Sequence, residues 1–153
     1  MLTQDDGRTI SMNTRTKEDY EKIKEYRNTT NRLAIHLGIR ITEVREGYCE
    51  GCMEYRPELG NSIGAIHGGA LFTMIDTVGG TAAASHGDNC TTSTITIQYL
   101  RASRSKGKLR CVARELKAGK RICSIQAEVY DEDGTLLTVA LCEYVRIPSM
   151  PIL

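Results

Sequence analysis

Residues 61–76 read N-S-I-G-A-I-H-G-G-A-L-F-T-M-I-D and place a polar loop, a histidine and two glycines directly before an apolar periodic segment. The apolar residues that recur at the spacing of one helix face are Ala70, Leu71, Met74, Ile75, Val78 and Ala82. This period predicts a helix from about Gly68 to about Ala84 whose apolar face packs against a core.

A second face of the same helix carries small residues and one acid, namely Thr73, Asp76, Thr77 and Gly80. A helix face that is open to solvent usually carries charged and polar side chains throughout. Because the side chains on this face are small, another surface can come close to it. We therefore expect Asp76 to lie in a confined and partly dry place.

The segment His67-Gly68-Gly69 stands where the predicted helix begins. The first N–H groups of a helix have no partner inside the helix, and the dipole makes that end electropositive. An anion or a developing oxyanion can bind there, and glycine lets a ligand carbonyl approach the backbone closely. A flexible Gly-Gly entry to the helix fits these residues as well, but Asn61 upstream and Asp76 downstream favour a catalytic segment.

Spacing along the helix separates the acid from the donors at the N-terminus. Asp76 follows His67 by nine positions, which is roughly 13 Å along the helix axis. A base and an oxyanion donor must each lie roughly 3 Å from the same reacting centre, so the acid of one helix needs the Gly68 N–H of another. A symmetric dimer with two antiparallel copies of the helix side by side meets that requirement, and we expect Gly79 and Gly80 to permit this approach.

The remaining chain predicts further helices and strands around this segment. Helices are expected from Thr16 to about Tyr26 and over residues 31–37. Strands are expected at 39–44, 48–55, 91–101, 108–117, 121–130 and 135–146. Because side chains alternate along a strand, Thr92 and Thr94 should share a face.

One motif resembles a known family. The pattern N-x-x-G-x-x-H-G-G, with an aspartate seven residues after the second glycine, resembles the hotdog-fold acyl-CoA thioesterases, in particular the phenylacetic-acid-degradation type. The segments T-I-Q-Y-L-R (96–101), G-K-L (107–109), G-K-R (119–121) and D-E-D-G-T-L-L (131–137) also resemble it, and the similarity covers about residues 30–148. It implies an α+β hotdog fold, in which a six-stranded antiparallel sheet wraps around one long central helix.

The resemblance also implies roles for five residues. Asp76 would activate water or attack the thioester directly, and the Gly68 N–H would stabilise the oxyanion. Asn61 matches the polar residue that holds the thioester or the water. His67 matches the motif histidine, which more often orients than transfers a proton, and Thr92 matches a hydroxyl-bearing site residue.

This chemistry needs no metal and no cofactor. A thioester carbonyl is electrophilic and its thiolate leaves readily, so one carboxylate with preorganised N–H donors can suffice. The sequence contains neither a G-x-S-x-G nucleophile elbow nor an H-E-x-x-H zinc motif, and it has only three histidines. We expect His36 and His86 to be ordinary surface or helix-end residues.

Length and composition narrow the class of protein. At 153 residues the chain suits one domain: we expect a loosely ordered N-terminus over 1–15 and a single hotdog domain over 16–153. A net charge of +1 with interspersed charges argues against a nucleic-acid partner. The sequence shows neither a membrane span nor a signal-peptide pattern at its N-terminus, so we expect a cytoplasmic protein without a membrane partner.

Six cysteines raise the question of a disulfide or metal site. Cys111, Cys123 and Cys142 fall at apolar strand positions, where cysteine behaves as a small hydrophobe, and reduced thiols are expected. The pair Cys49 and Cys52 has C-x-x-C spacing but lacks a second pair of ligands. On a regular strand these two would point to opposite faces, unless a bulge at Gly51 brings them together.

Three functions compete. The first is a thioesterase that acts on an aryl or short- to medium-chain acyl-CoA, as a homodimer assembled into a homotetramer. The second is a hotdog hydratase or dehydratase on enoyl or hydroxyacyl thioesters, against which the position of Asp76 after His67 argues. The third is a non-catalytic acyl-CoA binding module, against which the intact set of Asn61, Gly68 and Asp76 argues.

Overall fold

The computed structural model describes residues 15–104 and 107–153. The helices in this part are α1 (Lys17–Thr30), α2 (Arg32–Leu37), the 3-10 helix η1 (Pro57–Leu59) and α3 (Gly68–Ala84). The strands are β1 (Arg40–Arg45), β2 (Tyr48–Glu54), β3 (Asp88–Tyr99), β4 (Lys108–Ala118), β5 (Ile122–Tyr130) and β6 (Leu136–Pro151). The expectation for residues 1–15 lies outside the described residues, apart from Arg15.

Helix α3 has the predicted bounds, and its position at the centre of the fold explains its composition. Met74, Ile75 and Val78 are fully buried. From Thr77 to Ala84 every residue is buried, so this half of α3 is enclosed on all sides. Small residues fill most of that half, which lets the surrounding elements pack close to the helix.

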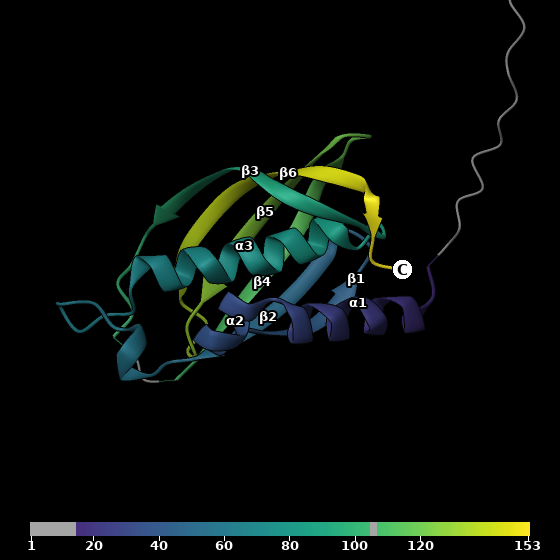
Figure 1. Ribbon diagram of the computed structural model, residues 1–153. Helices are drawn as coiled ribbons and strands as arrows, with labels where there is room; N and C mark the ends of the chain where they lie inside the picture. Colours follow the sequence, from purple (N-terminus) through teal and green to yellow (C-terminus); the bar gives the residue numbers. More distant parts are fainter. Residues whose placement is uncertain (1–14, 105–106) are drawn as a thin grey trace, which may run out of the picture.

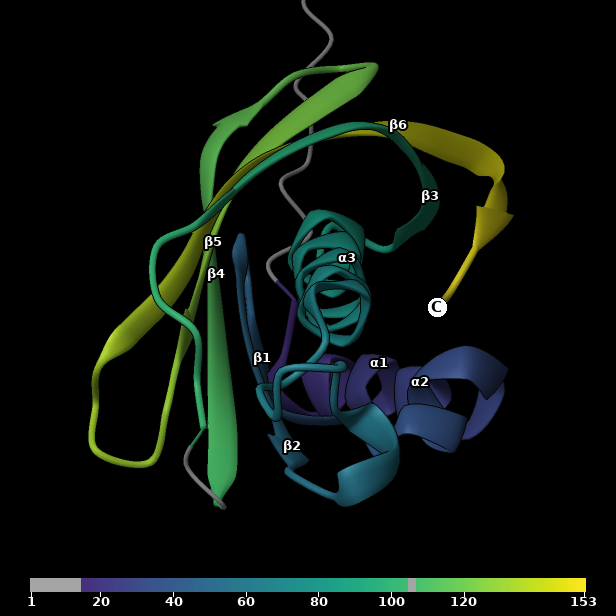
Figure 2. The same ribbon diagram turned by 90° about the vertical axis from the view of Figure 1, so that its left-hand side faces the viewer.

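The six strands form one antiparallel sheet in the order β1-β2-β4-β5-β6-β3. The sheet curves around α3, with β3 and β6 on one side of the helix and α1 and α2 on the other (Figures 1 and 2). Helix α3 connects β2 to β3 along the chain, and β3 forms one edge of the sheet, next to β6. This is the predicted hotdog architecture, a six-stranded antiparallel sheet wrapped around one long central helix.

Strands β3 and β6 are longer than predicted. Strand β3 begins at Asp88 instead of residue 91, and β6 continues to Pro151 instead of residue 146. The added residues pair with one another, since Asp88 lies opposite Pro151 and Asn89 opposite Ile147. These extra residues form strand because they pair with each other across the sheet, and not because apolar and polar residues alternate along them.

A β-bulge changes the face to which part of β3 points. Thr92 lies opposite Tyr144, whereas Thr94 lies opposite the adjacent residue Glu143, so Ser93 is the extra residue of the bulge. Directly opposed residues share a face, and Tyr144 is buried against the core. The prediction that Thr92 and Thr94 share a face is therefore wrong, because the bulge turns Thr92 toward α3.

The paired glycines of α3 pack against the chain's own sheet. A Cβ on Gly79 would lie 2.6 Å from the Tyr144 hydroxyl oxygen, and a Cβ on Gly80 would lie 3.4 Å from the same ring. Both glycines are buried. The expectation that they permit close approach of a second α3 is therefore wrong: they make room for Tyr144.

The thiols of Cys49 and Cys52 point to opposite faces of β2. Cys49 is fully buried and Cys52 is half-buried. The register of β2 against β4 is continuous through Gly51, and the nearby bulge lies on β1 at Thr42 instead. Among the described residues no group of three or more His, Cys, Asp or Glu side chains could hold a metal ion.

Three strand cysteines are buried, as predicted: Cys111, Cys123 and Cys142. Burial raises the pKa of each thiol, to about 12 for Cys123 and about 11 for Cys142.

None of the helices in residues 15–104 and 107–153 is long and apolar enough to cross a membrane.

Candidate active site

Asp76 and Thr92 meet between α3 and β3. The Thr92 hydroxyl donates a hydrogen bond of 2.6 Å to Asp76 Oδ1. The Tyr144 hydroxyl donates to the main-chain oxygen of Asp76 at 3.2 Å, and burial raises the pKa of Tyr144, so this group remains a donor. The carboxylate is thus oriented by a strand hydroxyl while its helix turn is held by a second one.

The half-buried Asp76 carboxylate lines a cavity of about 160 Å³ between α1, α3, β3 and β6. The residues around it are Arg27, Asn31, Asp76, Thr77, Gly80, Cys90, Thr91, Thr92 and Tyr144. Asp76 is the only carboxylate in this lining. The site therefore combines one acid with hydroxyl groups and one cation.

The N-terminus of α3 is shaped by His67 and Tyr99. His67 Nδ1 accepts a hydrogen bond of 2.8 Å from the Gly69 N–H, so the imidazole caps the helix. The Tyr99 hydroxyl donates to the Gly68 carbonyl oxygen at 2.9 Å. Among the described residues the Gly68 N–H has no acceptor, so it is available to a ligand.

Asn61 uses its side-chain oxygen to close its own loop. Asn61 Oδ1 accepts hydrogen bonds from the N–H groups of Ile63 and Ala65 at 3.1 and 3.0 Å. An amide has an acceptor end and a donor end, so in this orientation the Nδ2 group is the end that can bind a substrate. Asn61 and Gly68 line one cavity of about 310 Å³ beside Tyr99.

The five predicted site residues therefore lie in separate parts of one chain. Asp76 and Thr92 share one cavity, Asn61 and Gly68 share another, and neither cavity contains both the acid and the Gly68 donor. His67 lines a third cavity of about 290 Å³. One chain alone therefore holds two candidate half-sites, the cavity of Asp76 and Thr92 and the cavity of Asn61 and Gly68.

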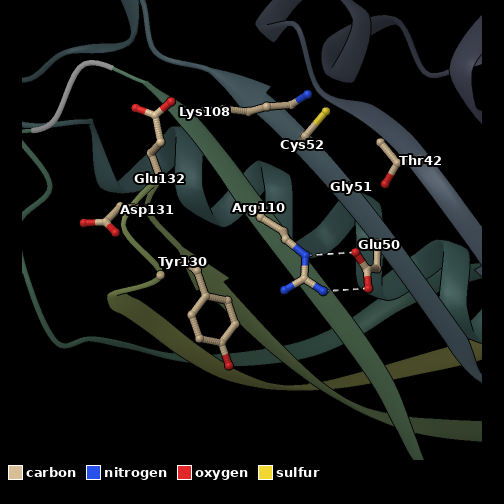
Figure 3. A pocket seen from close by; sticks show the side chains of 10 residues that line it. Thr42, Glu50, Gly51, Cys52, Lys108, Arg110, Tyr130, Asp131 and Glu132 are labelled. Atoms are coloured by element: carbon tan, nitrogen blue, oxygen red, sulfur yellow. Dashed lines mark hydrogen bonds and ion pairs between the residues drawn. The ribbon is translucent and has the colours of Figure 1, made fainter.

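A larger cavity is unrelated to these residues. It has a volume of about 750 Å³ and lies on the outer face of the sheet, over β2, β4 and the end of β5 (Figure 3). The Arg110 guanidinium donates two hydrogen bonds to Glu50 there, from Nε at 2.9 Å and from Nη2 at 2.7 Å. Asn61, His67, Gly68, Asp76 and Thr92 are all absent from the lining of this cavity.

Sequence reasoning missed two residues that hold the half-sites in place. Tyr144 supports the turn of Asp76, and Tyr99 anchors the carbonyl of Gly68. Both are tyrosines within alternating strands, where an aromatic residue is ordinarily explained by packing. Both tyrosines reach α3 because β3 pairs with β6 beside that helix. No local sequence pattern predicts this pairing.

Comparison with known proteins places the chain in a family. A sequence profile of the thioesterase superfamily matches residues 63–138. The proofreading thioesterase EntH of Cronobacter turicensis is 30% identical over 105 residues, which cover 67% of this chain and 76% of that protein.

Two solved structures show the same fold. The Escherichia coli PaaI protein, from the phenylacetic acid degradation operon, superposes with a TM-score of 0.77 at 24% identity and covers 84% of this chain and 95% of its own. A hypothetical thioesterase of Streptococcus pneumoniae TIGR4, solved with coenzyme A, gives a TM-score of 0.72 at 23% identity, with coverages of 76% and 93%. The chain belongs to the thioesterase superfamily and is a thioester hydrolase with the hotdog fold.

Proposed function

We propose that this protein hydrolyses an aryl or short- to medium-chain acyl-CoA to the free acid and coenzyme A. The observation that carries the proposal is the Asp76 carboxylate, oriented by Thr92 at 2.6 Å and placed in a polar cavity. The Streptococcus pneumoniae neighbour, solved with coenzyme A, supports the choice of thioester. We further propose that residues 16–153 act as one domain in the cytoplasm.

The carboxylate drives the reaction in one of two ways. With Oδ1 held by Thr92, Oδ2 either takes a proton from water, which then attacks the thioester carbon, or attacks that carbon itself. The Gly68 N–H stabilises the negative charge that develops on the carbonyl oxygen, and the Nδ2 group of Asn61 donates to the same thioester. The carbon–sulfur bond then breaks and the thiolate of coenzyme A leaves. In the first route it takes up the proton that Asp76 removed from water, and in the second route it leaves an anhydride between Asp76 and the acyl group, which water hydrolyses to the free acid.

The complete site is formed by two subunits. Asp76 of one subunit acts together with Gly68 and Asn61 of another, because one chain places them in different cavities. Two features support the binding of a second subunit beside α3 and β3. Phe72 on α3 is 37% exposed, and β3 forms an edge of the sheet with exposed residues from Thr91 to Thr94. An open strand edge is normally paired or covered. A homodimer, assembled into a homotetramer, supplies that cover.

The test is loss of thioester absorbance with a panel of aryl, short and medium acyl-CoAs, for wild type and Asp76→Asn. This substitution keeps the shape and removes the base, so turnover should fall by orders of magnitude. Hydrolysis by Asp76→Asn at the wild-type rate would refute the assigned role. Hydration of an enoyl-CoA without hydrolysis of any thioester would favour the hydratase function instead.

A further inference from the structure

Arg27, in the last turn of α1, has a guanidinium in which two of the three nitrogens are buried without a hydrogen-bond acceptor among the described residues. Its Nε and Nη2 atoms are inaccessible to solvent, and neither has a hydrogen-bond partner among the described residues. No ion pair joins Arg27 to a carboxylate within residues 15–104 and 107–153. Buried charged donors are costly to leave unpaired, so this side chain is placed for a partner that residues 15–104 and 107–153 do not provide.

The Arg27 side chain lines the same cavity as the Asp76 carboxylate. Cys90 lies beside it: burial raises the pKa of the Cys90 thiol, while the charge and hydrogen bonding of Arg27 act in the opposite direction. The Cys90 thiol donates its own proton to the carbonyl oxygen of Gly80 at 3.3 Å. A thiol sulfur is only a weak acceptor, so Cys90 does not satisfy the guanidinium.

The same protein shows how such a guanidinium is satisfied. Arg110 directs Nε and Nη2, the two atoms that are unpartnered in Arg27, to the two oxygens of the Glu50 carboxylate (Figure 3). A paired fork of this kind is the strongest arrangement for binding a carboxylate. Arg27 has the donors of this fork without the acid.

We propose that Arg27 binds a carboxylate at the far end of the acyl group, so that the preferred substrate is the coenzyme A thioester of a short dicarboxylic acid. This inference rests on the proposed function, because it places the thioester carbonyl at Asp76 and the acyl group in the cavity that Asp76 and Arg27 share. Arg27 is then the residue that determines acyl specificity.

The spacing along α3 limits the length of the acyl group. Gly80, beside Cys90 and Arg27, follows Asp76 by one turn, which is about 6 Å along the axis. A chain of about three methylene groups between thioester and carboxylate covers such a span. The cavity volume of about 160 Å³ agrees with a short chain.

The experiment compares glutaryl-CoA with pentanoyl-CoA, which has the same chain length and no carboxylate. Wild type is measured beside Arg27→Met, which keeps the bulk and removes the charge, and Arg27→Lys, which keeps the charge without the fork. Arg32→Met, at an exposed position on α2, is the matched control. In an Asp76→Asn background the dissociation constants of both thioesters are also measured by calorimetry, which needs no turnover.

Wild type should prefer glutaryl-CoA by about 10- to 100-fold in kcat/KM, mostly through KM, as a charged hydrogen-bonded pair provides. Arg27→Met should lose this preference with little change toward pentanoyl-CoA, and its midpoint of thermal unfolding should not fall, because the guanidinium has no partner to lose. Arg32→Met should behave as wild type.

Two results would overturn the inference. Equal kcat/KM for both thioesters in wild type would show that no carboxylate is recognised. An equal loss on both thioesters in Arg27→Met would show that Arg27 acts on Asp76 rather than on the substrate. If neither thioester is hydrolysed but glutaryl-CoA still binds more tightly through Arg27, the inference stands and the proposed hydrolysis fails.

Discussion

Adding one methyl group at Gly79 should destabilise the protein, whereas the same change at Gly80 should stabilise it. In the structure a Cβ on Gly79 would lie 2.6 Å from the hydroxyl oxygen and 3.3 Å from Cζ of Tyr144. Tyr144 is 1% exposed, and its hydroxyl is held by the hydrogen bond to the main-chain oxygen of Asp76. At Gly80 the corresponding contacts are 3.4 and 3.9 Å, which are ordinary packing distances.

The magnitudes separate the two variants. Replacing glycine by alanine inside a helix contributes about 1 kcal/mol of stability. At Gly79 overpacking costs about 1–3 kcal/mol, and loss of the hydrogen bond from Tyr144 to Asp76 costs about 1 kcal/mol more. The net effect of Gly79→Ala is a loss of about 1–3 kcal/mol, whereas Gly80→Ala should gain about 1 kcal/mol.

Thermal unfolding followed by circular dichroism at one fixed protein concentration tests this pair. For a chain of this size each kcal/mol shifts the midpoint by about 2–4 °C. The double variant Gly79→Ala/Tyr144→Phe should recover much of the lost stability, because removal of the hydroxyl relieves the contact. Equal midpoints for Gly79→Ala and Gly80→Ala would refute this packing and return the glycines to a contact between two copies of α3.

Three further outcomes follow from the site and the surface. Thr92→Val should lower turnover by about 10- to 100-fold through loss of its hydrogen bond to the carboxylate of Asp76, the proposed base or nucleophile, whereas Thr94→Val, across the bulge, should match wild type in the same thioester assay. Glu50→Gln should unfold at a lower temperature than wild type at pH 7, because the bidentate hydrogen bond from Arg110 holds the pKa of Glu50 below its ordinary value of 4.5. This stabilisation is lost as the pH falls below 4.5 and through the lower pKa of the folded protein, so the difference between the two midpoints of unfolding should disappear there. A difference that stays constant as the pH falls would contradict this. Iodoacetamide at pH 8 should label half-buried Cys52 before Cys123, whose pKa is raised to about 12 by burial, and mass spectrometry that found Cys123 labelled first in folded protein would contradict this.

Local patterns were sufficient to predict α3 and the order of the strands. The apolar period from Ala70 to Ala82 is strong, because the helix packs on the sheet through that face. Turn residues separate β4, β5 and β6 clearly, so both ends of β4 and β5 and the start of β6 were predicted within one residue. The ends of β3 and β6 were missed because residues such as Asp88 and Pro151 become strand only by pairing with each other.

The candidate site was only partly predictable. The motif around His67 and Asp76 is contiguous in sequence and could be recognised. The alignment of Thr92 with Asp76 needs a bulge at Ser93, and a bulge leaves no trace in an alternating pattern of threonines. The contact of Tyr144 with α3 depends on how distant strands are arranged in the sheet, which no local pattern shows. The burial of the Arg27 guanidinium depends on tertiary packing, which cannot be predicted from composition.

The most direct test of the central claim is activity of a heterodimer that combines an Asp76→Asn subunit with a Gly68→Ala subunit. Each variant alone should be inactive, because the first lacks the carboxylate and the second crowds the donor with a Cβ that would lie 3.2 Å from the Tyr99 ring. If the two half-sites come from different subunits, one site of each heterodimer has both wild-type residues and the other has neither. Co-expressed with two different affinity tags and purified on both, this heterodimer should recover about half of the wild-type turnover. A purified heterodimer as inactive as its parents would contradict a site shared between subunits.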